Sequence, residues 1–246
     1  MNKYLFHIQV PIYMNIEDIE QELGVMQLSD SFFPTGMFAT SNGLEFLFTE
    51  KKIHCVKDIA DIIKTNIIQQ IGPSDCIALA NAFDSANNND YEEIINIDAI
   101  VFATKAIKEI RDASVRSGIQ LVKCVSEFVS GDEVLNKYKE SITKNKAHGV
   151  FPVAFAICCN GLKIKKEKCM MMMMYGFTVS IVGAALRLGL IQHFEAQKII
   201  HMTKPIISQT IKENSKKSLS EMWQFAPQTD IIQMSHEKMD SKMFIT

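Results

Sequence analysis

Glycine and proline are scarce in this sequence of 246 residues, which contains 11 and 6 of them. Long segments of mixed polar and apolar residues run between them, which argues against a β architecture with many tight turns and favours helices. An excess of charge of either sign is also missing, because the formal net charge is −2 at pH 7. The chain therefore lacks the global basic field with which proteins attract nucleic acids or anionic membranes, and neither is an expected partner.

The composition of a disordered protein is absent too, since 47% of the residues are hydrophobic and 22% are charged. The six cysteines include no C-x-x-C pair, and Cys158 and Cys159 are adjacent, which is too strained for an ordinary disulfide. The N-terminus shows no basic region followed by an apolar core and a small-residue cleavage site, so no secretory signal is expected. These absences favour buried, reduced thiols in a cytoplasmic protein.

Motifs of catalysis and phosphate binding are missing as well. The sequence contains no G-x-x-x-x-G-K-[ST], G-x-G-x-x-G, H-E-x-x-H or G-x-S-x-G pattern. His193 and His201 can share a helix face, but two turns apart they are too distant to chelate a metal without a third element. Cys158 and Cys159 with His148 are compatible with a soft-metal site, although an apolar helix with two small thiols is the simpler interpretation. We expect no catalytic residue, no metal site and no cofactor.

One uncharged run must be compared with a membrane span. Residues 169–186 are 18 residues without a formal charge, the lower limit for a transmembrane helix. The run contains three hydroxyl side chains and two glycines, and Arg187 follows it directly. The preferred interpretation is a buried central helix, in which the methionines Met170–Met174 fill an irregular interior.

Apolar residues at helical spacing predict an all-α, single-domain bundle of about nine or ten helices. The clearest amphipathic segment is 56–71, in which isoleucines at every fourth position form one stripe. The Gly72-Pro73-Ser74 sequence is expected to end that helix, with Ser74 capping the next one. Pro205 is expected to kink or divide a later helix. Further helices are expected over residues 16–28, 97–129, 147–159, 169–186 and 194–212.

Both ends of the chain are expected to be flexible. Residues 1–16 form an arm with a short alternating apolar run that ends at Pro11, compatible with an edge strand or with an extended segment. Residues 227–246 form an amphipathic tail. Because no repeat and no low-complexity linker divides the chain, a single domain is expected over residues 1–246.

The most unusual segment is residues 30–45. Pro34 fixes φ, and Gly36 two positions later supplies positive φ, which suits a turn. Asn42 and Glu45 have the spacing of a capping box that opens the next helix. Two interpretations remain open, a buried connection between helices and a loop that also shapes a partner surface. Four large apolar side chains lie within this segment: Phe32, Phe33, Met37 and Phe38.

These residues resemble the N-terminal signature of the UreF family of urease accessory proteins. Further resemblances follow in the family's order along nearly the whole chain. Two departures are Met37, where many members have a second glycine, and Lys242-Met243, which replaces Arg-Leu; lysine and arginine are not equivalent at a bidentate contact. The matching segments are Gln27-Leu28-Ser29-Asp30-Ser31, Pro34-Thr35-Gly36, Gly43-Leu44-Glu45, Arg111-Asp112-Ala113-Ser114, His148 with Pro152-Val153-Ala154-Phe155, Ala184-Ala185-Leu186-Arg187-Leu188-Gly189, and the tail from Pro227 to Phe244.

The resemblance implies an all-α, usually dimeric protein without catalytic residues of its own. It also implies that the protein binds the nickel-handling GTPase UreG on one side and UreD, also called UreH, on the other. The assembly would deliver nickel to the urease apoprotein complex during GTP-dependent maturation. The alternatives are a generic all-α interaction module unrelated to nickel and, resting only on residues 169–186, a membrane-associated protein.

The tail is the preferred partner-binding segment. We expect it to become ordered when it docks on a UreD-like protein, with apolar anchors that include Ile231, Met234 and Phe244. His236 and Glu237 are expected to form an exposed charged pair. Arg187 follows a long uncharged run. Its guanidinium group is expected to form an ion pair or hydrogen bonds, either within the fold or at an interface, and not to face solvent freely. The predicted partner-binding residues are Phe38, Arg187, Ile231, Met234, His236, Glu237, Lys242 and Phe244.

Overall fold

The computed structural model describes residues 16–246, so the predicted arm lies outside the described residues except at its last position. No strand occurs between residues 16 and 246, and the predicted all-α fold is confirmed. Short 3-10 helices, η1 (Met37–Ala39) and η3 (Leu219–Glu221), and the π-helix η2 (Ile67–Cys76) lie between the α-helices. The α-helices are α1 (Ile16–Ser29), α2 (Leu44–Thr49), α3 (Val56–Asn66), α4 (Ile77–Asn87), α5 (Tyr91–Thr104), α6 (Lys108–Val125), α7 (Glu133–Thr143), α8 (Phe151–Gly161), α9 (Lys166–Arg187), α10 (His193–Asn214) and α11 (Pro227–Glu237).

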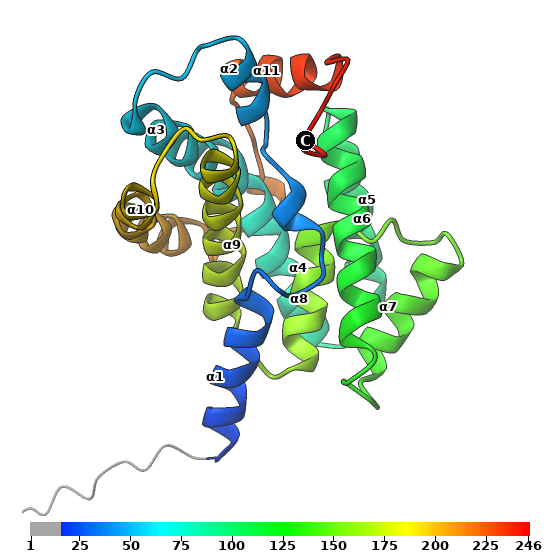
Figure 1. Ribbon diagram of the computed structural model, residues 1–246. Helices are drawn as coiled ribbons and strands as arrows, with labels where there is room; N and C mark the ends of the chain where they lie inside the picture. Colours follow the sequence, from blue (N-terminus) through cyan, green and yellow to red (C-terminus); the bar gives the residue numbers. More distant parts are fainter. Residues whose placement is uncertain (1–15) are drawn as a thin grey trace, which may run out of the picture.

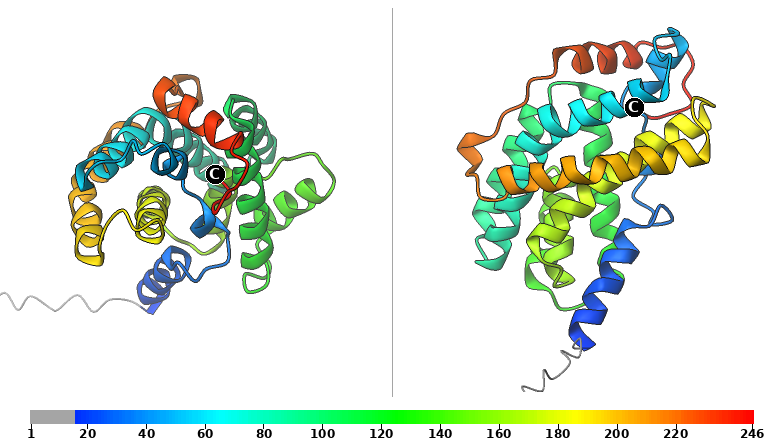
Figure 2. Two further views of the ribbon diagram at one scale, coloured as in Figure 1. Left: turned by 45° about the horizontal axis from the view of Figure 1, so that its top comes forward. Right: turned by 90° about the vertical axis from the view of Figure 1, so that its left-hand side faces the viewer.

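Helices α8 and α9 form the centre of the bundle. Helix α8 packs between α4 and α6, while α9 packs against α10, α8, α1 and η1 (Figures 1 and 2). Four of the five methionines Met170–Met174 are buried, as the interpretation of a central helix requires. Among the described helices only α9 is long and apolar enough to span a membrane by length and composition, a test that buried core helices also pass.

The predicted helix end at Gly72-Pro73-Ser74 is wrong, because α3, η2 and α4 form one continuous helical segment. The wider π-helical turn accommodates Pro73, which has no N–H to donate. Gly72 serves close packing instead, since a Cβ at this position would lie 2.4 Å from Thr210 Cγ2 of α10.

Two other predicted boundaries differ from the structure. Helix α10 is not divided at Pro205, which lies on its exposed side, where water can satisfy a carbonyl that has lost its partner. The predicted helix over 97–129 is split into α5 and α6 by residues 105–107. Lys105 ends α5 there and forms a partly buried ion pair with Asp75, its Nζ lying 2.7 Å from Asp75 Oδ1.

A buried carboxylate organises the loop that precedes α8. Asp98 has no exposed surface and accepts hydrogen bonds from the backbone N–H groups of His148 at 2.5 Å, Gly149 at 3.1 Å and Val150 at 3.0 Å. The hydroxyl of Tyr138 donates a fourth hydrogen bond at 2.7 Å. Burial and the neighbouring Asp98 raise the pKa of Tyr138, which keeps its hydroxyl protonated as a donor. This single side chain therefore joins α5, α7 and the start of α8.

Candidate functional site

The C-terminal tail lies against the loop between α1 and α2. The backbone N–H of Ile245 donates to the carbonyl of Ala39 at 2.8 Å, and the N–H of Ser41 donates to the backbone oxygen of Thr246 at 2.7 Å. Phe244 is only 3% exposed. The tail is thus packed against the rest of the single chain without any partner, whereas the sequence predicts that it becomes ordered only on docking. The difference arises because the loop offers backbone partners that the sequence pattern does not reveal.

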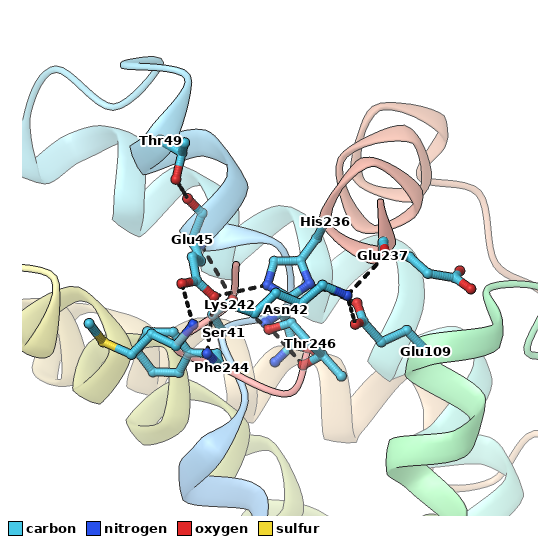
Figure 3. A network of polar contacts seen from close by, with 11 residues as sticks. Ser41, Asn42, Glu45, Thr49, Glu109, His236, Glu237, Lys242, Phe244 and Thr246 are labelled. Carbon is cyan, nitrogen blue, oxygen red and sulfur yellow. Dashed lines mark hydrogen bonds and ion pairs between the residues drawn. The ribbon is translucent and has the colours of Figure 1, made fainter. Parts of the chain in front are cut away.

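Glu45 of α2 anchors the tail (Figure 3). Its carboxylate accepts hydrogen bonds from the N–H groups of Met243 at 2.6 Å and Phe244 at 3.0 Å, and its Oε2 lies 3.0 Å from His236 Nε2. The predicted capping box with Asn42 does not form. Gly43 occupies the N-cap position of α2 with a φ of 87°, and Glu45 is directed to the tail instead.

His236 of α11 lies between two glutamates. Its Nδ1 lies 2.7 Å from Glu109 Oε2 of α6, on the other side of the ring from Glu45. Lys242 Nζ donates to Glu109 Oε1 at 2.8 Å and to the carbonyl of Glu237 at 3.0 Å. When the imidazole ring is protonated, both of its nitrogens donate to a carboxylate. We call Glu45, Glu109, His236 and Lys242 the tail junction.

The prediction of an exposed His236–Glu237 pair is half wrong. His236 has no exposed surface, while Glu237 is exposed. The sequence pattern misses the burial because the carboxylates that surround His236 come from α2 and α6, 191 and 127 residues away. A buried, partnered histidine holds the tail in place and is not available to an outside partner while the junction is closed.

The junction makes the tail sensitive to acid. Burial alone raises the pKa of Glu45, but hydrogen bonds from the Met243 N–H, His236 and the Phe244 N–H outweigh burial and lower it below its ordinary value. The folded-state pKa is therefore below the unfolded value of about 4.3, so the stabilisation is complete above about pH 4.3 and is lost as the pH falls through the folded-state pKa.

We therefore expect the free energy of unfolding of the wild type to exceed that of Glu45→Gln at neutral pH, with the difference shrinking below about pH 4.3. Urea unfolding at a series of pH values measures this. The exposed Glu127→Gln is the matched control and should show no such pH-dependent difference. A Glu45→Gln difference that persists unchanged at acidic pH would contradict the assigned role of the carboxylate.

Arg187, Phe38 and Phe244, three of the predicted partner-binding residues, lie together. The guanidinium carbon of Arg187 is 4.1 Å from the ring centroid of Phe38 and 4.5 Å from that of Phe244, which places the cation over both aromatic rings. Its Nη2 donates to the carbonyl of Phe38 at 2.5 Å, and its Nε donates to the carbonyl of Gly183 at 3.1 Å. Partial burial lowers the pKa of Arg187. Arg187 thus ties the tail to α9 within the fold.

Ile231, Met234 and Glu237 lie on the outer side of the tail. Ile231 and Met234 of α11 are 61% and 44% exposed, and Glu237 is exposed as well. Lys242 belongs to the tail junction instead, and its side chain is 25% exposed. Phe38 keeps half of its surface in contact with solvent even though it contacts Arg187. The sequence does not point to Glu109 as part of the site, and it assigns Glu45 to a different role. The inner side of the tail is therefore fastened to the bundle, and its outer side exposes apolar side chains to solvent.

The cysteines and histidines do not assemble into a metal site in the part of the chain that the structure describes. No group of three or more His, Cys, Asp or Glu residues between positions 16 and 246 is placed to hold a metal ion. Cys76, Cys158, Cys159 and Cys169 are buried as free thiols, but Cys55 is exposed, contrary to the expectation of buried thiols throughout. Burial raises the pKa of Cys158 and Cys169, which keeps both as unreactive thiols.

The fold and the tail junction define an all-α protein in which a buried polar cluster fastens the C-terminal tail. The family model UreF matches residues 53–204. The urease accessory protein UreF of Trichodesmium erythraeum is 32% identical over 227 residues, covering 92% of this chain and 97% of the relative. That of Photorhabdus laumondii is 28% identical over 220 residues (89% and 96%), and UreF 1 of Brucella melitensis is 30% identical over 224 residues (91% and 92%). The chain belongs to the UreF family of urease accessory proteins.

Proposed function

We propose that the protein is a non-catalytic, cytoplasmic scaffold that links a nickel-handling, UreG-like GTPase to a UreD/UreH-like protein. Its role is GTP-dependent nickel insertion into the urease apoprotein complex, and it acts as a homodimer. Membership of the UreF family supports the role in urease maturation. The observation that carries the scaffold assignment is the tail, which is fastened by the junction and yet presents Ile231 and Met234 to solvent.

The mechanism we propose is differential binding. A scaffold changes the activity of a bound GTPase only if it binds one conformation of that GTPase more tightly than another. The protein would stabilise the conformation that is competent for nickel transfer, without supplying a catalytic group. Nickel is cargo in this assembly.

The tail is proposed to contact the UreD-like partner through its outer side. Ile231 and Met234 supply apolar anchors, and Glu237 on the same helix supplies a charge beside them. Lys242 contributes by its bond to Glu109, which fastens the tail. Arg187, Phe38, Phe244 and His236 contribute mainly by holding this surface in position, since their contacts are made within the chain. The generic interaction module unrelated to nickel has no support from family membership.

Co-expression with a urease operon that lacks this gene tests the proposal. We expect little active urease at limiting nickel without the gene and full activity when the wild type is restored. Ile231→Asp combined with Met234→Asp should lose capture of the UreD-like protein and restore little activity, because charges replace both anchors. The control Phe128→Asp, 45% exposed outside the tail, should behave as the wild type. Normal activation in the absence of the gene would refute the maturation role.

A further inference from the structure

A groove lies beside the fastened end of the tail, between α6 and the loop that follows α1. Its volume is ≈ 470 Å³. In Figures 1 and 2 the end of the chain lies between this loop and α6, and Ile245 of the tail lines the groove. The face of α6 that carries Arg116, Gln120 and Lys123 forms another wall, and the turn at residues 34–36 contributes as well. The groove is therefore built from three separate parts of the chain.

The lining of this groove carries positive charge without a compensating acid. Arg116 and Lys123 are exposed, and neither forms an ion pair with any residue between positions 16 and 246. Asp112, one turn before Arg116, pairs with Lys108 instead. No aspartate or glutamate is among the described residues that line the groove. Since the chain as a whole has a net charge of −2, the groove is a local exception that attracts negatively charged groups.

The spacing of the two cations indicates an extended acidic peptide. Arg116 and Lys123 lie two turns apart on the same face of α6, about 10 Å along the helix axis. A single phosphate ion could meet both only if the two side chains bent toward each other. Carboxylates at alternate positions of an extended segment lie about 7 Å apart on one side, within reach of both long side chains. Two carboxylates of one segment can therefore pair with the two cations at once.

The groove also offers partners for the backbone of such a segment. Ser117 is only 4% exposed, and its hydroxyl forms no hydrogen bond with any of residues 16–246, although Ser117 lines the groove. Gln120 is exposed on the same face and presents an amide group. Hydroxyl and amide groups bond to backbone N–H and C=O groups, and Ile119 and Ile245 add apolar contacts. Cations combined with such groups are typical of the recognition of acidic peptide motifs.

We propose that this groove binds an extended acidic segment of a partner protein, and that it does so only while the tail is fastened. Ile245 is held in the wall because its N–H donates to the Ala39 carbonyl at 2.8 Å. Release of the tail removes this wall. A bound acidic segment therefore stabilises the fastened tail by the same factor by which fastening strengthens binding. The site is separate from Ile231 and Met234, so it goes beyond the proposed function.

Fluorescence anisotropy with the full-length protein at about 0.15 M salt tests the groove. The probe is a short labelled peptide in which glutamate and threonine alternate, and the control probe has glutamine in place of glutamate. We expect only the acidic peptide to bind. Arg116→Glu combined with Lys123→Glu should weaken its binding by at least about a hundredfold. This variant should instead bind a peptide in which lysine and threonine alternate, because the charge of the groove is reversed.

A control of equal charge separates the groove from the overall charge of the protein. Lys198→Glu combined with Lys212→Glu, both exposed on α10, should bind the acidic peptide as the wild type does. All four side chains are exposed, so circular dichroism should stay unchanged in both double variants. Equal binding of the acidic and glutamine peptides, or an unchanged affinity after the Arg116 and Lys123 substitutions, would overturn the site. Displacement of the peptide by millimolar inorganic phosphate would show a simple anion site and overturn the peptide assignment.

Limited proteolysis tests the link between the groove and the tail. Saturating acidic peptide should slow cleavage between residues 238 and 246 of the wild type, and the glutamine peptide should not. Glu45→Ala, which removes the acceptor of the Met243 and Phe244 N–H groups, should bind the acidic peptide at least about tenfold more weakly. Peptide binding that leaves cleavage unchanged would overturn the link. None of these outcomes decides the role in urease maturation, which the co-expression experiment tests separately.

Discussion

Replacing Glu45 with alanine should release the end of the tail while the helical bundle remains folded. The substitution leaves the N–H groups of Met243 and Phe244 and the His236 ring without their common acceptor. Each buried donor that loses its partner costs about 1–3 kcal/mol, and the cost is greater when the donor is charged. Detachment lets water satisfy these groups, so the tail opens in preference to remaining closed with them unpaired. We expect a loss of about 3 kcal/mol or more in the free energy that holds the tail closed.

Limited proteolysis measures this release directly. Cleavage between residues 238 and 246 should become at least about a hundredfold faster in Glu45→Ala than in the wild type, because cleavage follows the population of the open tail. Capture of the UreD-like protein should fall in parallel if the tail surface must be held in place. Glu50→Ala, at the exposed end of α2, is the matched control and should leave both measurements unchanged. Unchanged cleavage in Glu45→Ala would show that other contacts fasten the tail.

The second large effect is expected at Asp98. Alanine at this position leaves three backbone N–H groups and the Tyr138 hydroxyl without an acceptor in the core. Breaking a buried network in this way is expected to lower the free energy of unfolding by about 3–5 kcal/mol. The free energy of unfolding of a typical domain is only about 5–15 kcal/mol in total. The start of α8 should become the least protected part of the core, because Asp98 positions residues 148–150 before it.

Urea unfolding followed by circular dichroism tests the role of Asp98. Asp98→Asn should be less destabilising than Asp98→Ala, since one amide oxygen can still accept hydrogen bonds. The control Asp112→Ala removes an exposed ion pair with Lys108 and should cost no more than about 0.5 kcal/mol. A similar loss in Asp98→Ala and Asp112→Ala would contradict the central role of the buried carboxylate.

The identity of a buried hub such as Asp98 could not be predicted from the sequence. Its spacing from Ile94 and Val101 places Asp98 on the apolar stripe of α5, but the sequence does not show which donors meet the carboxylate there. Its role depends on the donors of residues 148–150, which the packing of α5, α7 and α8 places within hydrogen-bond distance. The same is true of Glu109, whose importance arises from His236, 127 residues further along the chain.

Two local sequence patterns predict a structure that tertiary packing overrides. The Gly72-Pro73-Ser74 sequence has the properties of a helix stop, but the approach of α10 makes Gly72 a packing residue within a continuous helical segment. Asn42 and Glu45 have the spacing of a capping box, but the carboxylate is needed by the tail. In both cases the long-range contact contributes more than the local preference.

The sequence alone determined the all-α class, the central position of the methionine-rich helix and membership of the UreF family. These depend on the spacing of apolar residues and on short motifs, which are local properties of the chain. Tertiary structure decided that the tail is already fastened, that Arg187 lies over Phe38 and Phe244, and that His236 is buried between two glutamates. Each of these joins residues more than 50 positions apart, and the energy of a buried polar contact depends on partners and solvent exclusion that only packing provides.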